Sequence, residues 1–352
     1  MAPGPAELLE RPTPAVSREA AAAVADRLYG VAGEATPLGG ERDHNFLISG
    51  RRNRLALKFA HPAEPVSVLE MQQQGLRHLA RVDPDLPVPR AFPTAAGDLV
   101  ATVEIGGAVL PVRAVTYLPG VLLEGRRSTG PLRRNLALLL ARLDRALDGF
   151  SHPGAERDYL WDLTQVTRLR PYTVHLSADR RRLAEDLLDH LGERVLPALP
   201  HLRAQVIHSD VNPANLLVDP AAPDRLVGVI DFADLIRAPL VFDLAIAAAY
   251  QCMGEGEPGM VIAGLAGAYH SHLPLDAAEI DLLPDLATAR LVQSMIISGW
   301  RVGLHPDNRE YILMHAEPVW RALQILASLS PTGLIDAVRR ACERVGGSRH
   351  GR

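Results

Sequence analysis

Polar side chains that could perform chemistry are concentrated in the stretch QVIHSDVNPANLLVD, residues 205–219. A short apolar run leads into Asp210, and Asn215 precedes a second apolar run. An aspartate can orient a hydroxyl group and accept its proton, and an asparagine oxygen can bind magnesium, which prefers hard oxygen ligands. A loop between two strands would present both groups to one spot. These residue types favour transfer of a phosphoryl group to a hydroxyl.

A further oxygen ligand follows in RLVGVIDFADL, residues 225–235, where a β-branched run ends at Asp231 and Phe232. Asp210 and Asn215 match the spacing of the kinase loop H-R-D-L-x-x-x-N, and Asp231-Phe232 parallels D-F-G. Each pattern alone has an ordinary structural explanation, because Asp and Asn often bond their own backbone or cap a helix. Their occurrence together, in this order and at strand ends, favours the chemical interpretation.

The only lysine of the chain, among 37 lysine and arginine residues, lies in RLALKFA, residues 54–60. Strand alternation places Ala56 and Lys58 on one face and the larger apolar residues on the other. LALK matches the V-A-I-K pattern of a nucleotide-binding strand, so we expect Ala56 under the base and Lys58 on the phosphates. Compositional drift toward arginine is the alternative explanation for the single lysine. Glu70, in the helical stretch 65–82, is the expected ion-pair partner of Lys58, with an ordinary solvated residue as its alternative.

Further nucleotide contacts are expected at two turns. Gly39 and Gly40 follow an expected strand and could bring backbone N–H groups close to a phosphate, although a plain hairpin turn explains them equally well. Tyr117 and Leu118 open the connector YLPG, residues 117–120, which we expect to form a hinge and to contact the nucleotide. The ligand site would then lie in the cleft beside this hinge.

The elements that must position these residues fall into two regions. Residues 17–116 are expected to form an N-terminal nucleotide-binding lobe, whose first helix begins at Ser17 and ends at Gly30. Short apolar runs bounded by turn residues then predict about five antiparallel strands: ATPLGG, NFLISG, RLALKFA, LVATVEI and AVLPVRAVTYL. The stretch PVSVLEMQQQGLRHLARV predicts a helix with Pro65 in its first turn.

Residues 121–345 are expected to form a larger, mainly helical C-terminal catalytic and substrate lobe, with a few short strands between 205 and 231. The segment RRNLALLLARLDRALDGF has leucines at helical spacing, which is typical of an amphipathic core helix. Residues 1–16, rich in Pro and Ala, are expected to form a flexible arm, and residues 346–352 a disordered tail.

Composition limits the class of protein. The 352 residues are 47% hydrophobic and 22% charged with a net charge of −4, which is ordinary for a globular protein and offers no basic stripe for nucleic acid. Two distant cysteines fit a reducing compartment. The N-terminus lacks the apolar core of a signal peptide, and no apolar run is long enough to span a bilayer. We therefore expect a cytoplasmic protein without a membrane partner, whose oligomeric state the sequence leaves open.

The motifs HSDVNPANLL, IDFAD, LALK and YLPG together resemble those of the aminoglycoside phosphotransferase and choline kinase-like superfamily. The segments GGERDHNFLI, VRAVTYLPG and IDFADLIRAPLVFDLAIAAAY are similar to the hydroxylysine kinase-like branch, which includes kinase modules fused to some aminotransferases. The resemblance covers residues from about 20 to about 330. It implies an α+β, two-lobed protein-kinase-like fold, with a five-stranded antiparallel sheet in the N-terminal lobe and a larger, mainly helical C-terminal lobe.

The resemblance also implies residue roles. Asp210 would be the catalytic base, Asn215 and Asp231 the Mg²⁺ ligands, and Lys58 the nucleotide lysine, with ATP or GTP as phosphate donor. Ala233 departs from the glycine of D-F-G, a change we expect a small-molecule kinase to tolerate. No A-P-E motif follows, and the chain leaves no room for an activation loop, which argues against a protein substrate.

The expected acceptor is a small amine-bearing alcohol, hydroxylysine-like or another amino alcohol. An aminoglycoside or other antibiotic is the alternative acceptor, and a nucleotide-binding pseudokinase is the alternative of another class. The candidate substrate residues are acids and aromatics that would suit a cationic amine: Asp234, Asp162, Trp161, Trp300 and Tyr311. Core packing or a surface ion pair is the alternative explanation for each. Asp243 is expected to cap a helix or to brace the catalytic loop.

Overall fold

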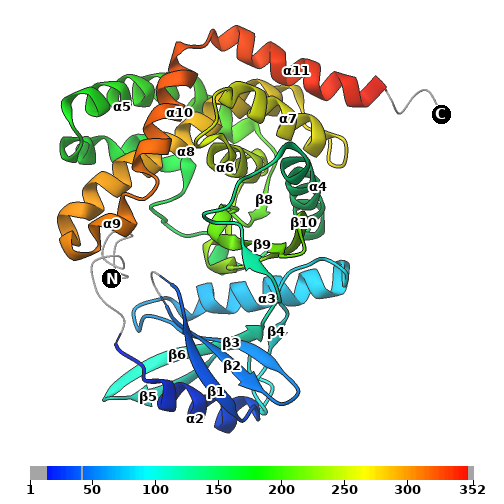
Figure 1. The fold of residues 1–352 in the computed structure, drawn as a ribbon, viewed down its shortest axis with the longest axis vertical. Helices are drawn as coiled ribbons and strands as arrows, with labels where there is room; N and C mark the ends of the chain where they lie inside the picture. The colour runs from blue at the N-terminus through cyan, green and yellow to red at the C-terminus, as the bar shows by residue number, and fades with distance from the viewer. Residues whose placement is uncertain (1–13, 41–42, 348–352) are drawn as a thin grey trace. The chain divides into compact units, whose positions relative to one another are not determined.

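A computed structural model describes residues 14–40 and 43–347 of the chain (Figure 1). Contacts between Cα atoms divide the chain into two compact units, each built from three segments. The first unit consists of Met1–Gly120, Gly149–Leu160 and Val227–Ile236, and the second of Val121–Asp148, Trp161–Leu226 and Arg237–Arg352. The segment that carries Asp231 therefore belongs to the same unit as Lys58, whereas Asp210 belongs to the second unit. The hinge predicted at 117–120 stays a prediction.

An antiparallel sheet forms the centre of the first unit. Its strands are β1 (Gly33–Leu38), β2 (His44–Gly50), β3 (Arg54–Phe59), β4 (Ala91–Phe92), β5 (Ala101–Ile105) and β6 (Ala108–Thr116). The order is β1-β2-β3-β6-β4, and β5 also pairs with β6. The sheet thus has six strands instead of the five that were predicted. The additional strand, β4, has two residues, and a run this short carries no alternation that a sequence pattern could reveal.

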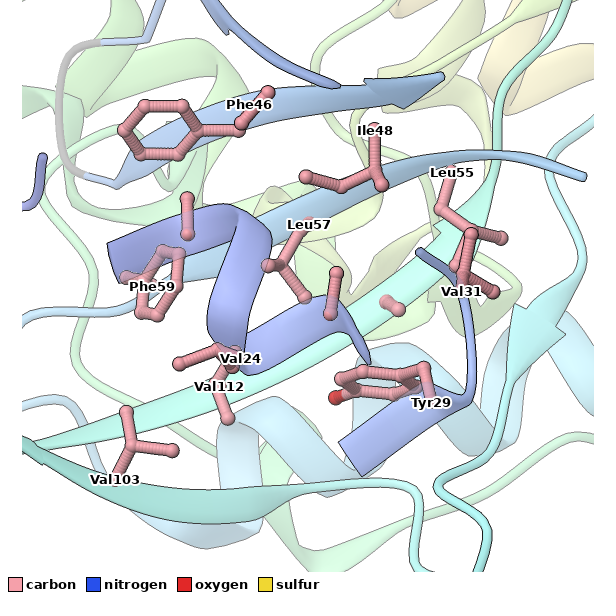
Figure 2. Packing of buried hydrophobic residues seen from close by; sticks show 14 of the residues in the cluster. Val24, Tyr29, Val31, Phe46, Ile48, Leu55, Leu57, Phe59, Val103 and Val112 are labelled. Carbon is pink, nitrogen blue, oxygen red and sulfur yellow. The ribbon is translucent and has the colours of Figure 1, made fainter. Parts of the chain in front are cut away.

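The apolar face of this sheet packs against helix α2 (Arg18–Tyr29). Figure 2 shows Leu55, Leu57 and Phe59 of β3 directed toward the residues of this helix. The helix begins where predicted, since the Ser17 side chain accepts a hydrogen bond from the backbone of Ala20, and it ends at a left-handed glycine. Because the three large residues of β3 are fully buried on this face, its other face carries Ala56 and Lys58, as predicted.

Helix α3 (Val66–Val82) follows β3 and belongs to the same unit. Its buried face includes Leu69, Gln72, Leu76 and Leu79, which recur at helical spacing. Pro65 is the N-cap residue of this helix, and not a member of its first turn as predicted. The helix contacts the 3-10 turn η6 (Phe232–Asp234), which directly follows Asp231.

The second unit is mainly helical. Its helices are α4 (Gly130–Leu147), α5 (Ala178–His190), α6 (Val241–Cys252), α7 (Pro258–His270), α8 (Ala277–Leu304), α9 (Arg309–Ile312), α10 (Ala316–Ser328) and α11 (Pro331–Gly347). Helix α6 is buried on almost every side and packs against α7 and α8, so it forms the centre of this core. Helix α11 continues to Gly347, so the predicted tail begins two residues too early where the structure describes it. The rest of that tail, and residues 1–13 of the predicted arm, lie outside the described residues.

Short strands and turns connect these helices. The strands are β7 (Val121–Leu122), β8 (Ala204–Ile207), β9 (Leu216–Asp219), β10 (Ala222–Val229) and β11 (Ile236–Pro239), paired in the orders β10-β9-β7 and β11-β8. The 3-10 and π segments are η1 (Pro153–Ala155), η2 (Leu163–His175), η3 (Leu191–Val195), η4 (Leu196–His201), η5 (Pro213–Asn215), η6 and η7 (Pro306–Asn308). Within residues 14–40 and 43–347, none of the helices has the length and apolar character needed to cross a bilayer.

Candidate active site

In the first unit, the predicted nucleotide lysine and the predicted metal carboxylate form an ion pair. Lys58 projects from β3, and its Nζ donates a hydrogen bond of 2.8 Å to Oδ1 of Asp231, in the loop after β10. The lysine side chain is 14% exposed and the carboxylate 40%. The two residues are 173 positions apart, so this contact brings together two motifs that the sequence could only place separately. Because 40% of the Asp231 side chain is exposed, its carboxylate can offer an oxygen ligand to a cation.

Glu70 was the predicted partner of Lys58, whereas the carboxylate that pairs with Lys58 in the structure is that of Asp231. Glu70 is exposed on α3, whereas the buried polar residues of that helix are Gln72 and Gln73, which are 4% and 1% exposed. The prediction used distance along the chain and did not ask which face of the helix position 70 occupies.

The backbone after Asp231 is held by two donors from the first unit. Gln72 Nε2 donates to the carbonyl oxygen of Ala233 at 3.4 Å, and Arg157 Nη2 donates to the same oxygen at 2.9 Å. Arg157 also forms an ion pair with Glu64, in which Nη1 lies 3.8 Å from Oε1. Helix α3 therefore helps to fix the segment that follows Asp231, and it does so through the side-chain amide of Gln72.

Two residues with positive φ mark the motifs. Among the described residues, Ser209 at φ 66° and Asp231 at φ 62° are the only non-glycine residues in the left-handed region. Such a conformation costs on the order of 1–3 kcal/mol and persists only where the surroundings hold it. One residue precedes Asp210 and the other is the predicted metal ligand, so the strain occurs at both predicted chemical centres. This concentration favours a functional constraint over an ordinary turn.

In the second unit, hydrogen bonds fix both carboxylate oxygens of Asp210. Its Oδ1 accepts from Arg290 Nη2 at 3.1 Å, and its Oδ2 accepts from Asn212 Nδ2 at 2.9 Å and from Asn215 Nδ2 at 2.8 Å. Asn215 Nδ2 also donates to the backbone oxygen of Asp210 at 2.9 Å. Because the amide nitrogen of Asn215 is used in this way, its Oδ1 is the atom left to act as an oxygen ligand. The loop thus provides both groups that its sequence predicted.

Asp243, in the first turn of α6, braces this loop. Its Oδ2 accepts from the backbone N–H of His208 at 2.8 Å, and its Oδ1 accepts from that of Ser209 at 2.5 Å. The N-cap of α6 is Leu240, so of the two predicted roles for Asp243 the structure confirms the brace and not the cap. Burial is the main cause that raises the pKa of Asp243, while the charge of His208 and the hydrogen bonds from the loop lower it.

A second buried carboxyl group, that of Asp144, neighbours the carboxyl group of Asp243. Asp144, on α4, accepts a hydrogen bond of 2.6 Å at Oδ2 from the hydroxyl of Tyr269, on α7. Burial raises the pKa of Asp144 well above its ordinary value, and the neighbouring charge of Asp243 raises it further. Two adjacent buried carboxyl groups do not readily ionise together, so the raised pKa of Asp144 favours its protonated form.

A contact with strand β2 explains why position 40 of the glycine pair lacks a side chain. Gly39 and Gly40 directly follow β1, and Asn45 Nδ2 donates to the backbone oxygen of Gly39 at 3.0 Å. A Cβ atom on Gly40 would lie 2.3 Å from that same amide nitrogen, so this position excludes any side chain unless Asn45 moves. Residues 41–42, which follow, lie outside the described part of the chain. Ala56 is half-buried on the face of β3 that carries Lys58.

At the predicted connector, the backbone N–H of Tyr117 donates to the carbonyl oxygen of Arg54 at 2.9 Å. The Arg54 guanidinium also lies over the Tyr117 ring, 4.5 Å from its centroid. Leu118 is half-buried beside it. One ring face of Tyr117 is therefore occupied by the protein itself, which leaves the predicted nucleotide contacts of these two residues as predictions.

Two of the predicted substrate residues make contacts with a structural role. Asp162 caps η2, since its Oδ1 accepts from the backbone N–H of Thr164 at 2.9 Å and its Oδ2 accepts from the hydroxyl of the same residue at 2.6 Å. Trp300 is buried on α8 and packs against Tyr172 with ring centroids 4.7 Å apart. For Trp300 this contact fits the alternative of core packing, whereas the cap formed by Asp162 is neither of the two alternatives predicted for it.

The remaining predicted substrate residues have different outcomes. The ring of Trp161 does take part in a cation–π contact, but its partner is Arg290 of the same chain, 4.6 Å from the ring centroid. Asp234 is buried in η6 of the first unit, where it stays a prediction. The side chain of Tyr311 lies outside what the structure describes.

Arg290 is the residue of this site that sequence reasoning missed. It stands in the run LATARLVQSMII of α8, where a guanidinium among apolar residues is the signal that could have found it. Its partner Asp210 lies 80 residues earlier, so no local pattern connects the two.

The fold and the site geometry define a phosphotransferase. Residues 34–282 match the model of the phosphotransferase enzyme family, and because this match spans well over half of the chain, the protein belongs to that family. The chain is 29% identical to hydroxylysine kinase of Danio rerio over 342 residues, which covers 93% of this chain and 95% of the relative. The resemblance seen in the sequence is thereby confirmed.

Solved structures show the same fold. An amicoumacin kinase, in complex with AMP-PNP, Ca²⁺ and Ami, superimposes with a TM-score of 0.65 at 15% identity, covering 85% of this chain and 91% of that chain. A microcompartment-associated aminopropanol kinase gives a TM-score of 0.63 at 20% identity, covering 92% and 97%. The predicted α+β, protein-kinase-like fold is confirmed. The protein is a small-molecule kinase that uses a nucleotide as phosphate donor.

Proposed function

We propose that this kinase transfers the γ-phosphate of ATP or GTP to a hydroxyl of a small amine-bearing alcohol, such as hydroxylysine or another amino alcohol. The observation that carries the proposal is the carboxylate of Asp210, which three donors hold in one orientation beside a left-handed residue. A base that must align a hydroxyl with a phosphorus needs such a fixed position. The similarity to hydroxylysine kinase over nearly the whole chain supports the choice of substrate class.

In the proposed reaction, Asp210 orients the acceptor hydroxyl and receives its proton. The hydroxyl oxygen attacks the γ-phosphorus, and the bond between this phosphorus and the β–γ bridging oxygen breaks. The nucleoside diphosphate is the leaving group. Because the transition state of phosphoryl transfer is loose, most of the catalysis comes from positioning and from electrostatic stabilisation.

Lys58 would neutralise phosphate charge, and its compact ammonium suits a narrow position between phosphate oxygens. In the structure, the ion pair with Asp231 already fixes the position of this ammonium group. The loop of Gly39 and Gly40 could add backbone N–H groups, since Gly40 excludes a side chain. Ala56 would leave room for the base on the same face.

Asp231 and Asn215 would hold Mg²⁺. They fit this ion chemically, since one is a carboxylate with an exposed face and the other has an amide oxygen left over from its bonds to Asp210. No group of three or more His, Cys, Asp or Glu among the described residues could hold a metal. Two oxygen ligands suit Mg²⁺, which keeps several waters and binds phosphate oxygens. When bound, the ion would supply positive charge to the phosphate oxygens.

Two alternatives have distinct support. The fold likeness to an amicoumacin kinase keeps an antibiotic acceptor in consideration, although it concerns the fold alone. A pseudokinase would be expected to have lost at least one of the four groups Lys58, Asp210, Asn215 and Asp231, and this chain retains all of them.

The test is a phosphorylation screen with purified protein, Mg²⁺, and either ATP or GTP. Acceptors would include hydroxylysine, short amino alcohols, aminoglycosides and neutral sugars, with Asp210→Asn as the matched inactive control. We expect phosphorylation of amine-bearing alcohols by the natural chain only. Products on neutral sugars alone would refute the amine class, and equal turnover by Asp210→Asn would refute the mechanism.

A further inference from the structure

Two buried polar side chains flank Lys58 on the sheet of the first unit. The pairing of the strands places Asn45 of β2 opposite Lys58 on one side and Arg113 of β6 opposite it on the other. Directly opposite residues of neighbouring strands have their side chains on the same face of a sheet, so these three side chains form one row. Asn45 is 8% exposed and Arg113 is 2% exposed, which makes Lys58 the most accessible member of the row.

Arg113 reaches across the sheet to the chain that precedes β2. Its Nη2 donates a hydrogen bond of 2.7 Å to Oδ2 of Asp43, whose side chain is 14% exposed. Strand β3 lies between β2 and β6, and neighbouring strands are about 4.8 Å apart, so the arginine side chain must pass over β3 on the face that carries Lys58. The ion pair thus ties residue 43 to a strand that is a direct neighbour of Lys58.

Asn45 binds the other end of the same connection between β1 and β2. Its Nδ2 donates to the backbone oxygen of Gly39 at 3.0 Å. The two ends also approach each other closely, since a Cβ atom on Gly40 would lie 2.9 Å from the backbone oxygen of Asp43. Gly39 and Asp43 are therefore each bound by a side chain that flanks the nucleotide lysine, and these two hydrogen bonds hold the glycine pair from both sides.

Stability alone does not account for an arginine at position 113. A buried ion pair can often be replaced by apolar residues without loss of stability, because burial removes both charges from water. Here Arg113 Nη1 and Asn45 Oδ1 are also buried without a hydrogen-bond partner among the described residues, and such atoms are rare because each one costs free energy. Like charges directly opposite each other on a sheet, as in Lys58 and Arg113, are unfavourable as well. The concentration of these costs beside the nucleotide lysine favours a functional reason for the arginine.

We propose that Arg113 is a positioning residue of the nucleotide site, which through Asp43 fixes the glycine pair beside Lys58 so that the backbone N–H groups of Gly39 and Gly40 can bind phosphate. This inference rests on the proposed function, because it gives Arg113 a role in the same nucleotide site. Backbone donors bind an anion best where their positions are fixed beforehand, since the ordering of a free turn on binding would oppose the affinity.

The first experiment measures the binding of ADP or GDP, with Mg²⁺, by calorimetry, which requires no acceptor. Arg113→Gln should weaken this binding by about 10- to 100-fold, the factor expected for the loss of a hydrogen bond to a charged group. The KM for the nucleotide should rise by a similar factor while kcat stays within about threefold of the natural value, because Asp210 belongs to the other unit. A residue that only supported the fold would not separate KM from kcat in this way.

Two further variants keep the test decisive. Asp43→Asn breaks the same ion pair from its more exposed end, and it also serves if the arginine variant does not fold. Because the two residues act as one unit, the double variant should bind nucleotide about as weakly as either single variant. The matched control is Arg133→Gln, which breaks the ion pair of a mostly buried arginine with Glu255 in the second unit. This control should lower the unfolding temperature and leave the nucleotide affinity unchanged.

Natural nucleotide affinity in both single variants would overturn the inference and leave the ion pair with a structural role only. Losses of affinity that add fully in the double variant would overturn it as well, because the two residues would then act separately. Either result, with nucleotide binding by the natural chain, would leave the proposed phosphoryl transfer standing. If the natural chain bound no nucleotide, both the inference and the proposed function would fall. Failure to find an acceptor, together with the expected losses of affinity, would support the inference and count against the proposed substrate class.

Discussion

Lys58→Arg is the most informative single substitution, because it keeps the charge and changes the shape. Register places Asn45 and Arg113 opposite Lys58 on the two neighbouring strands, and both side chains are buried. A larger guanidinium therefore cannot occupy the position of the ammonium without a shift. A misplacement of about 1 Å at a reacting group can cost about 100-fold in rate, and loss of one well-placed donor costs about 2.7–4 kcal/mol.

The effect on stability should be much smaller. Asp231 is 40% exposed, so its ion pair with Lys58 is screened by solvent and contributes about 0.2–1 kcal/mol. The variant should thus lose about 100- to 1,000-fold in kcat/KM while its unfolding free energy changes by about 1 kcal/mol or less. This separation between activity and stability is the expected signature.

The assay measures kcat and KM by release of nucleoside diphosphate, together with urea unfolding followed by circular dichroism. Arg339→Lys is the matched control, because it makes a cation exchange of the same kind at a half-exposed ion pair with Asp281, at 2.7 Å in the second unit. The control should leave turnover unchanged and alter the unfolding free energy by about 1 kcal/mol or less. Turnover of Lys58→Arg within about threefold of the natural chain would refute the argument that the phosphate site requires an ammonium.

Three other predictions address the carboxylates. Asp210→Asn should abolish turnover yet bind nucleotide with nearly natural affinity by calorimetry, and a large loss of affinity would contradict its role toward the hydroxyl. Asp231→Asn should remove the Mg²⁺ dependence of nucleotide binding, whereas normal Mg²⁺-dependent binding would contradict the metal assignment. Burial raises the pKa of Asp144, so in the folded protein this carboxyl group binds a proton that it has lost in the unfolded chain. The resulting contribution to the free energy of unfolding falls as the pH rises from the ordinary pKa of an aspartate through the pKa of Asp144 in the folded state. Asp144→Asn should therefore gain stability relative to the natural chain as pH rises in that window, and a pH-independent difference in urea unfolding would contradict the protonated state.

The features found from sequence are those encoded locally. Asp210 and Asn215 lie in one short loop, Asp231 follows a β-branched run, and alternation alone places Lys58 opposite the apolar face of β3. The brace role of Asp243 was also within reach, because a buried acid at the start of an apolar helix needs partners. The change in periodicity near residue 120 separated a region with a sheet from a mainly helical one, and the fold class followed from the resemblance of the motifs.

The features missed depend on contacts between distant segments. The partner of Lys58 in the structure is 173 residues away, and the distance along the chain pointed instead to Glu70, an exposed residue of α3. Arg290 reaches Asp210 only because α8 packs beside the catalytic loop. The aromatic ring of Trp161 looked suited to a ligand cation, and the structure gives that cation as Arg290. Sequence identified the type of interaction here without the means to identify its partner.

The two left-handed residues have a consequence for engineering. Glycine adopts positive φ without the penalty that other residues incur, so a selection for thermal stability alone would favour glycine at positions 209 and 231. At Ser209 the loop uses the backbone N–H, which glycine retains. At Asp231 the same exchange would delete the carboxylate that holds Lys58. Stabilising libraries built on this chain should therefore admit glycine at position 209 and keep position 231 constant.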